Sequence, residues 1–141
     1  MPTRTASATW EGGLQNGKGN FKGEGGTITG SYTAGSRFAE ETGTNPEELL
    51  AAAHAACYSM ALSGMLEKAG HPPRSITTNA ACTVERVGTG FTITTMRLST
   101  RADVPGIENA QFQELAAGAR DGCPVSRALT GVKVELEATL A

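Results

Sequence analysis

The sequence has little that would direct the protein to nucleic acid or to an anionic membrane surface. Its 12 Lys and Arg residues are offset by 14 Asp and Glu residues, which leaves a formal net charge of -2 at pH 7. The two signs are mixed along the chain, without a basic stripe or a polybasic run. Because phosphate backbones and acidic lipid headgroups bind where positive charge is concentrated, we expect neither partner.

The chain also lacks the cysteine content and the leader of a disulfide-stabilised secreted protein. It has three cysteines, Cys57, Cys82 and Cys123. An odd number without an export signal argues against a structural disulfide framework. The first ten residues, MPTRTASATW, contain no apolar segment of the kind found in signal peptides. We therefore expect a cytoplasmic protein whose thiols are either inert core residues or chemically active groups.

No internal repeat and no linker divides the 141 residues, so we expect a single domain over residues 1–141. Turn signals occur at Asn16-Gly17 and Gly25-Gly26 in a part rich in glycine and threonine. Elsewhere, apolar residues recur at strand or helix spacing. We expect an α+β pattern with antiparallel sheet. The expected elements in chain order are strands at 3–11, 19–23 and 26–32, a loop at 33–44, a helix within 45–70, strands at 75–87 and 91–104, a helix at 108–120, a short helix after residue 123 and a strand at 132–140.

The long helix is marked at both of its ends. Asn45 is a suitable N-cap, Pro46 suits the first helical position, and Glu48 completes a capping box with Asn45. At the other end Lys68 complements the helix dipole, and Gly70 can adopt the left-handed cap conformation. The sequence therefore predicts a helix between the caps Asn45 and Gly70.

The interior of this helix is apolar on nearly every side. Between Leu49 and Leu66 the clearly polar side chains are His54, Ser59 and Ser63. A helix that is apolar all round is buried, and so short a chain has little material to cover it, so we expect a homodimer that completes the cover. A membrane span is the competing interpretation, because the length approaches that of a spanning helix. The polar interruptions and the absence of a flanking basic cluster argue against it.

Two of the cysteines stand in positions that favour chemistry. If Pro124 is the first residue of a short helix, Cys123 is its N-cap, and unpaired backbone N–H groups lower the pKa of its thiol. Cys57 lies in the middle of the apolar helix, where burial disfavours the thiolate. It therefore needs a nearby cation, for which Arg37 and His54 are the candidates.

Each candidate also has an ordinary structural interpretation. Arg37 would need an acid to hold its guanidinium, and Glu47 in the first turn of the helix could do so through a bidentate pair. His54 precedes Cys57 by three residues and lies on the same side of the helix. A buried cysteine is often an inert small hydrophobe, a first-turn acid often only complements the dipole, and a core histidine often only binds a carbonyl. Cys82, among apolar neighbours on a strand, is interpreted as a core residue.

Two cysteine-containing motifs resemble those of a known family. The first is TNPEELL at 44–50 with AHAAC at 53–57, and the second is GCPVS at 122–126. On these motifs the sequence resembles the OsmC/Ohr family of osmotically inducible protein C and organic hydroperoxide resistance proteins. His54 and the Ser36-Arg37-Phe38 segment favour the OsmC branch. The resemblance covers essentially the whole chain, with further similar segments at 10–12, 17–19, 36–38, 90–91 and 104–107.

The resemblance implies a fold, an activity and a set of site residues. Members of the family are thiol-dependent peroxidases that reduce organic hydroperoxides and, less efficiently, hydrogen peroxide. They are intertwined homodimers in which antiparallel sheets surround a long buried central helix and the active sites lie at the subunit interface. By this resemblance Cys57 is the peroxidatic cysteine, Cys123 is the resolving cysteine, and Arg37 and Glu47 are the activating pair. An external dithiol restores the thiols, and no metal or organic cofactor is implied because sulfur carries the redox change.

Three other functions remain open from the residues alone. A cysteine hydrolase could use Cys57 with His54, although residues at this spacing on one helix are poorly placed for a base that a third group must orient. A metal site could combine Cys57, Cys123, His54 and His71, although the spacing matches no usual zinc pattern. A binding module could hold a hydrophobic ligand beside Cys57 without turnover, because a fold does not fix a function.

Overall fold

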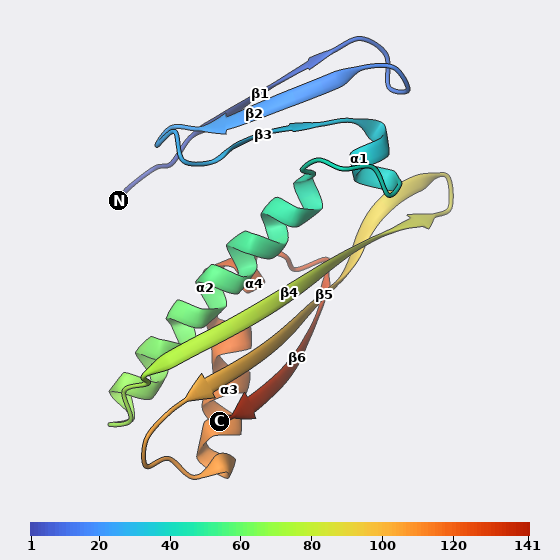
Figure 1. The fold of residues 1–141 in the computed structure, drawn as a ribbon. Helices are drawn as coiled ribbons and strands as arrows, with labels where there is room; N and C mark the ends of the chain where they lie inside the picture. The colour runs from blue at the N-terminus through green and yellow to red at the C-terminus, as the bar shows by residue number, and fades with distance from the viewer. The chain divides into compact units, whose positions relative to one another are not determined.

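The computed structural model describes residues 1–141, which fall into two compact units, Met1–Leu49 and Leu50–Ala141. The prediction of a single domain over residues 1–141 stays a prediction. Figure 1 shows the course of the chain through six strands and four helices. In chain order these are β1 (Ala6–Glu11), β2 (Lys18–Gly23), β3 (Thr29–Tyr32), α1 (Ala34–Phe38), α2 (Pro46–Lys68), β4 (Ser75–Val87), β5 (Gly90–Asp103), α3 (Asn109–Gly122), α4 (Pro124–Ala128) and β6 (Lys133–Leu140).

The first unit is built on an antiparallel sheet in the order β1-β2-β3. Three aromatic rings pack together on it, with centroids 5.5 Å apart for Trp10 and Tyr32 and 6.1 Å apart for Phe21 and Tyr32. This packing requires glycine at position 19, because a Cβ there would lie 2.6 Å from the Tyr32 ring and 2.9 Å from the Trp10 ring. The three strands were predicted within a few residues of their bounds.

The segment 33–44 contains a short helix that the sequence did not predict. Residues 34–38 form α1, and Thr33 caps it, with Thr33 Oγ1 accepting from the Ser36 N–H at 3.1 Å and Ser36 Oγ accepting from the Thr33 N–H at 2.9 Å. This reciprocal capping box uses Ser in place of the usual Glu or Gln at its third position. A five-residue helix has no room for an apolar periodicity, which explains why the segment was interpreted as a loop.

Helix α2 begins and ends where its caps predicted. Asn45 Oδ1 accepts from the Glu48 N–H at 2.8 Å, which satisfies one of the free donors of the first turn. At the C-terminal end Gly70 has φ of +85°, and the His71 N–H donates to the Leu66 carbonyl at 2.9 Å. These are the features of a glycine cap that closes the helix.

The second unit contains the sheet β4-β5-β6, and here one expectation was wrong. β4 and β5 form the predicted antiparallel hairpin, but β6 pairs with β5 in the parallel direction. The cause is the connection: α3 and α4 lie between β5 and β6, so the chain crosses over and returns in the same direction. The α+β class itself is confirmed.

One face of this sheet carries the core of the second unit. Cross-strand pairs such as Ala80 with Leu98 and Leu98 with Leu136 place apolar side chains of all three strands on that face. A register shift after Thr83 brings Ile93 opposite Val84, on the same face as Met96, whereas strict alternation along the strand would put Ile93 on the other face. The fully buried apolar residues are Tyr58, Leu62, Leu66, Met96, Leu98, Ala102, Phe112, Ala116, Ala119 and Cys123.

Within this chain α2 is buried along one side only, whereas the sequence predicted burial all round. In Figure 1 it runs alongside β4, and Ser59 Oγ donates to Thr78 Oγ1 at 2.8 Å. The buried side carries His54, Tyr58 and Leu62, and the opposite side is an exposed apolar stripe. By length and composition α2 could also cross a membrane, a test that core helices of soluble proteins pass as well. The exposed stripe of the second unit consists of Ala52, Ala53, Ala56, Met60 and Gly64.

Candidate functional site

The second unit brings two predicted site residues, Cys57 and Cys123, into contact although 66 positions separate them in the sequence. Their Sγ atoms lie 2.9 Å apart, and both residues are thiols. Cys57 is half-buried in the middle of α2, and Cys123 is fully buried at the junction of α3 and α4. The geometry suits conversion of the two thiols into a disulfide with little movement.

The local sequence explains why α4 begins at this point. Pro124 has no N–H to lose and a φ suited to the first helical position, so it stops α3 and starts α4. Cys123 is the residue between the two helices, and its carbonyl accepts from the Arg127 N–H at 3.0 Å. No first-turn N–H makes a well-aligned cap hydrogen bond to its side chain. The Val125 and Ser126 N–H groups nonetheless face the sulfur and favour its anion.

The two thiols of the second unit differ in acidity. Burial raises the pKa of Cys57, and the hydrogen bond with Cys123 raises it further. Burial opposes ionisation of Cys123 as well, but the hydrogen bonds from the Cys57 thiol and from the backbone and hydroxyl of Ser126 outweigh it, so the pKa of Cys123 is lowered. The residues of the second unit therefore favour the thiolate at Cys123 over that at Cys57.

The first unit contains the predicted pair of Arg37 and Glu47. Arg37 Nε donates to Glu47 Oε1 at 3.0 Å, and Nη2 donates to the same oxygen at 2.9 Å. The Glu47 side chain is 7% exposed and that of Arg37 is 37% exposed, so the acid is fixed and the guanidinium keeps an open side. A charge-assisted contact of this kind orients the guanidinium plane.

Hydrogen bonds within the first unit explain why these two side chains meet. Ser36 Oγ donates to the Thr44 carbonyl at 3.0 Å, and Asn45 Nδ2 donates to the Ser36 carbonyl at 3.2 Å. The segment after α1 is therefore folded back so that the start of α2 lies beside α1. Arg37, at the fourth position of α1, then faces Glu47 in the first turn of α2.

An apolar pocket of about 260 Å³ adjoins Arg37 in the first unit. The Arg37 guanidinium carbon also lies 5.0 Å from the centre of the Phe38 ring, which is cation–π geometry. The pocket joins a positive charge to an aromatic wall, a combination that suits a molecule with an apolar body and a polar, electron-rich end. Its lining consists of Trp10, Leu14, Tyr32, Thr33, Ala34, Arg37 and Phe38.

His54 makes a contact that the sequence did not indicate. Its Nε2 lies 2.7 Å from Ser126 Oγ, and no hydrogen bond joins it to Cys57, the partner that a hydrolase would need. Burial lowers the pKa of His54, so the imidazole is neutral at pH 7. Ser126 was missed because serine is common near helix starts, yet its position three residues after Cys123 placed it in the first turn of α4. No group of three or more His, Cys, Asp and Glu residues is placed to hold a metal ion.

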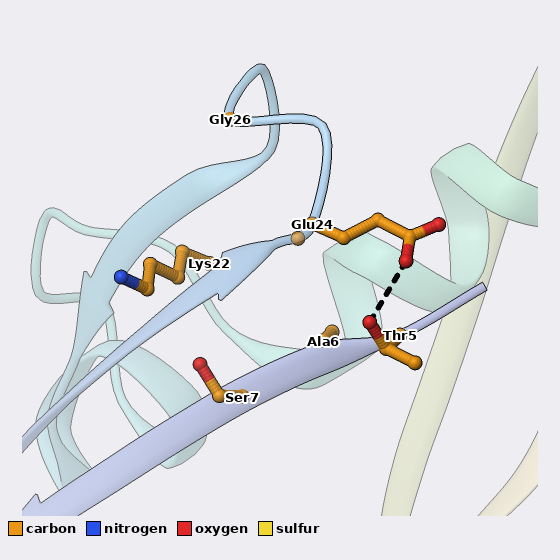
Figure 2. A pocket seen from close by; sticks show the side chains of 7 residues that line it. Thr5, Ala6, Ser7, Lys22, Glu24 and Gly26 are labelled. Atoms are coloured by element: carbon orange, nitrogen blue, oxygen red, sulfur yellow. Dashed lines mark hydrogen bonds between the residues drawn. The ribbon is translucent and has the colours of Figure 1, made fainter.

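A second hollow of the first unit has no chemistry of this kind. It has a volume of about 300 Å³ and lies between β1 and the turn after β2 (Figure 2). Thr5 Oγ1 donates to Glu24 Oε2 at 2.8 Å at its edge. Its lining contains no cysteine or histidine. Cys82, the third cysteine, is half-buried on β4 opposite Met96, as its core interpretation predicted.

Comparison with known proteins gives consistent matches. The family model described as OsmC-like protein matches residues 39–137. The chain is 46% identical to Peroxiredoxin OsmC of Escherichia coli (strain K12) over 127 residues, 89% of each chain. It is 32% identical over 100 residues to the organic hydroperoxide resistance protein of Xanthomonas axonopodis pv. citri, covering 70% of this chain and 68% of that protein.

Solved structures with a similar fold include proteins of the same kind as the relatives found by sequence. The crystal structure of an organic hydroperoxide resistance protein from Elizabethkingia anophelis matches with a TM-score of 0.76 and 28% identity, over 100% of this chain and 98% of that one. The family match extends over more than half of the chain, and the Escherichia coli relative shares both its length and nearly half of its residues. The chain belongs to the OsmC family.

Proposed function

We propose that this protein is a thiol-dependent peroxidase that reduces organic hydroperoxides to alcohols and, less efficiently, hydrogen peroxide to water. The observation that carries the proposal is the 2.9 Å separation of the Cys57 and Cys123 sulfurs. Two thiols in contact can accept the two oxidising equivalents of a peroxide and store them as a disulfide. The names of the relatives, a peroxiredoxin and organic hydroperoxide resistance proteins, agree with this chemistry.

In the first step the Cys57 thiolate attacks the terminal oxygen of the hydroperoxide. The O–O bond breaks, the alkoxide takes up a proton and leaves as the alcohol, and Cys57 becomes a sulfenic acid. Since its surroundings in the second unit raise the pKa of Cys57, a cation must favour its thiolate. We assign that role to Arg37, which also stabilises the charge that develops on the leaving oxygen, and we assign to Glu47 the fixing of the guanidinium.

In the second step the Cys123 thiolate attacks the sulfur of the Cys57 sulfenic acid. The S–O bond breaks, hydroxide leaves and is protonated to water, and a Cys57–Cys123 disulfide remains. The lowered pKa of Cys123 increases the fraction of this residue that is present as the attacking thiolate. An external dithiol then returns two electrons and two protons, which restores both thiols without a metal or an organic cofactor.

The apolar pocket beside Arg37 supports an organic substrate. Aromatic and aliphatic side chains such as Trp10 and Leu14 line it, and the guanidinium lies at its edge. In this arrangement the organic part of the hydroperoxide lies against the rings and the peroxide group against the cation. Hydrogen peroxide has no organic part, so it gains nothing from the pocket.

The exposed stripe of α2 supports a homodimer. Met60 is 75% exposed, and the neighbouring stripe positions are alanine and glycine, which allow a second backbone to approach closely. We propose that two copies of the chain cover this stripe, and that residues 1–141 act as one cytoplasmic domain within the dimer. Met60→Asp would place a charge at the centre of the contact, so light scattering should then give the mass of one chain in place of two.

Peroxide consumption tests the proposed activity directly. The wild-type protein with dithiothreitol should consume cumene hydroperoxide faster than hydrogen peroxide, and Cys57→Ser should abolish both reactions. Cys82→Ser is the matched control, because it removes a half-buried thiol from the same unit and should leave the rate unchanged. Equal rates for wild type and Cys57→Ser would refute the peroxidase assignment and leave a binding function.

A further inference from the structure

The contact between His54 and Ser126 has no role in the mechanism above, and it has features that packing alone does not explain. His54 is fully buried, and its Nε2 lies 2.7 Å from Ser126 Oγ. Its Nδ1 is buried without any hydrogen-bond partner. An unpartnered buried polar atom destabilises a fold, and an apolar side chain at this position would avoid that cost.

Ser126 connects this imidazole to the reactive sulfurs. It lies in the first turn of α4, and both its hydroxyl and its N–H favour the anionic form of Cys123. Ser126 is half-buried, with one side on a polar cavity of about 470 Å³ at the end of α3. The order of contacts is therefore His54, Ser126, Cys123 and Cys57.

The tautomer of His54 follows from its surroundings. A neutral imidazole has one N–H, and a buried N–H without a partner is rarer than a buried acceptor without one. The proton therefore lies on Nε2, which donates to Ser126 Oγ, and Nδ1 is the unpartnered acceptor. With its oxygen already accepting from His54, the Ser126 hydroxyl is free to donate its hydrogen to the Cys123 sulfur.

We propose that His54 and Ser126 position the resolving cysteine: the buried imidazole holds Ser126 Oγ so that the hydroxyl hydrogen points at Cys123 Sγ and keeps this sulfur an oriented thiolate. This inference rests on the proposed peroxidase function. Ser126 contacts a reacting atom, whereas His54 acts through Ser126 and is a positioning residue. The hydroxyl holds its proton throughout the step, and the proton of the Cys123 thiol is released to solvent before the attack.

None of the other charged or titratable groups near these contacts replaces Ser126 as the side-chain hydroxyl donor to the Cys123 sulfur. Cys57 on α2 is the thiol partner of Cys123. Arg120 and Asp121 at the end of α3 line the same cavity as Ser126, but they pair with each other at 2.8 Å. Arg127 on α4 is exposed, and the cavity lining also contains the apolar Val132, just before β6, and Val134 of β6.

The first test measures the acidity of Cys123 in a chain that carries Cys57→Ser and Cys82→Ser, so that Cys123 is the remaining thiol. The rate of alkylation by iodoacetamide is followed against pH. Adding Ser126→Ala should move the midpoint upward by about one pH unit, because a charge-assisted hydrogen bond to the thiolate is lost. His54→Leu should give a shift of similar size, and His54→Gln, whose amide nitrogen can replace Nε2, should restore most of the original midpoint.

The second test measures the resolving step in chains that retain all three cysteines. After one equivalent of cumene hydroperoxide, rapid quenching with a sulfenic acid trap and mass spectrometry follows the conversion of sulfenic acid into disulfide. Ser126→Ala and His54→Leu should slow this conversion by about tenfold at pH 7. The matched control is Ser59→Ala. Ser59 lies on the same helix as His54, and its half-buried hydroxyl donates to Thr78. The substitution should change neither the midpoint nor the conversion.

The outcomes separate this inference from the proposed function. If the wild-type chain forms neither a sulfenic acid nor a disulfide, the peroxidase proposal fails. If the wild-type chain turns over and Ser126→Ala resolves at the wild-type rate with an unchanged midpoint, the positioning role is refuted. If His54→Gln is as impaired as His54→Leu, the imidazole only fills space, and its role through Ser126 is refuted as well. Each of these variants should keep the wild-type circular dichroism spectrum.

Discussion

Cys57 and Cys123 have the same kind of side chain and lie in contact, yet their surroundings shift the pKa values of the two thiols in opposite directions. Cys57 lies in the middle of α2, where the N–H groups of the helix itself are used within it, and the Val125 N–H of α4 is the one backbone donor that favours its anion. Cys123 lies at the start of α4, where first-turn N–H groups and a hydroxyl face its sulfur. The pKa of Cys57 is raised by burial, and the pKa of Cys123 is lowered, despite burial, by the hydrogen bond from Cys57 and by these donors. Position within a helix therefore contributes to the different acidities of the two sulfurs.

The difference has a consequence for the order of the reaction. Cys123 obtains its backbone and hydroxyl donors from Val125 and Ser126, which are close to it in the sequence, in addition to the hydrogen bond from the Cys57 thiol. Cys57 must obtain a cation from elsewhere, and Arg37, fixed by Glu47 in the other unit, is the one assigned here. In the proposed cycle the sulfur that is harder to ionise must therefore react first.

Removing each sulfur in turn should give the largest and most distinct effects. Cys57→Ser should lower peroxidase activity by about ten-thousand-fold, because the nucleophile is lost. Cys123→Ser should still reduce one equivalent of hydroperoxide and then stop, with Cys57 advancing to sulfinic acid under excess peroxide. Burst kinetics and mass spectrometry measure both. A full burst from Cys57→Ser with none from Cys123→Ser would reverse the assignment of the two roles.

Removing the cation should selectively impair Cys57. Arg37→Met should slow the formation of the Cys57 sulfenic acid by about a hundredfold to a thousandfold, as the loss of a charge-stabilising donor does in other enzymes. Glu47→Gln should slow it by about tenfold, because the guanidinium keeps its charge but loses a charge-assisted contact worth about 1.5 to 3 kcal/mol. Stopped-flow measurement of the first step gives both values. An Arg37→Met chain that reacts at the wild-type rate would show that Cys57 is activated in another way.

The acidities themselves should separate with pH. In a Cys57→Ser chain the alkylation of Cys123 should reach half of its maximal rate below pH 8.5, about the pKa of a free thiol. In a chain with Cys123→Ser and Arg37→Met the midpoint for Cys57 should lie above that value, because burial remains and the cation is gone. In chains without Arg37, the alkylation rate of Cys57 should therefore fall at a higher pH than that of Cys123 as the pH is lowered. Equal midpoints would remove the basis of the comparison.

The smallest effect should come from a buried polar contact that involves neither sulfur. Tyr58 is fully buried on α2, and its hydroxyl donates to the Ala116 carbonyl at 3.2 Å. Tyr58→Phe should lower the free energy of unfolding by about 1 kcal/mol and leave the peroxidase rate within about twofold. Chemical denaturation and a turnover assay measure the two quantities. A large loss of activity would extend the site beyond the groups named here.

Local signals in the sequence predicted the parts of the structure that depend on neighbouring residues. The caps of α2 at Asn45 and Gly70, the strand at 75–87 and the N-cap position of Cys123 were all predicted, because each depends on a short stretch of side chains. The contact of Arg37 with Glu47 was predicted from chemistry, since a partly buried guanidinium needs an acid. The approach of Cys57 and Cys123 followed from the family resemblance, because nothing in the spacing of the two motifs implies it.

Features that depend on distant parts of the chain were missed. The parallel pairing of β6 follows from the crossover through α3 and α4, and the bulge after Thr83 from the packing of two long strands. Neither leaves a local mark in the sequence. The contact of His54 with Ser126 joins residues 72 positions apart. The sequence predicted that α2 is apolar on nearly every side. Which of its sides is covered by the rest of the same chain depends on tertiary packing and could not be predicted.

Mass spectrometry of the chain after one equivalent of cumene hydroperoxide tests the central assignment most directly. The proposed mechanism predicts a loss of two mass units, a peptide cross-link between Cys57 and Cys123, and an unmodified Cys82. Oxidation at Cys82, or a stable sulfenic acid on Cys57 beside an intact Cys123 thiol, would contradict it.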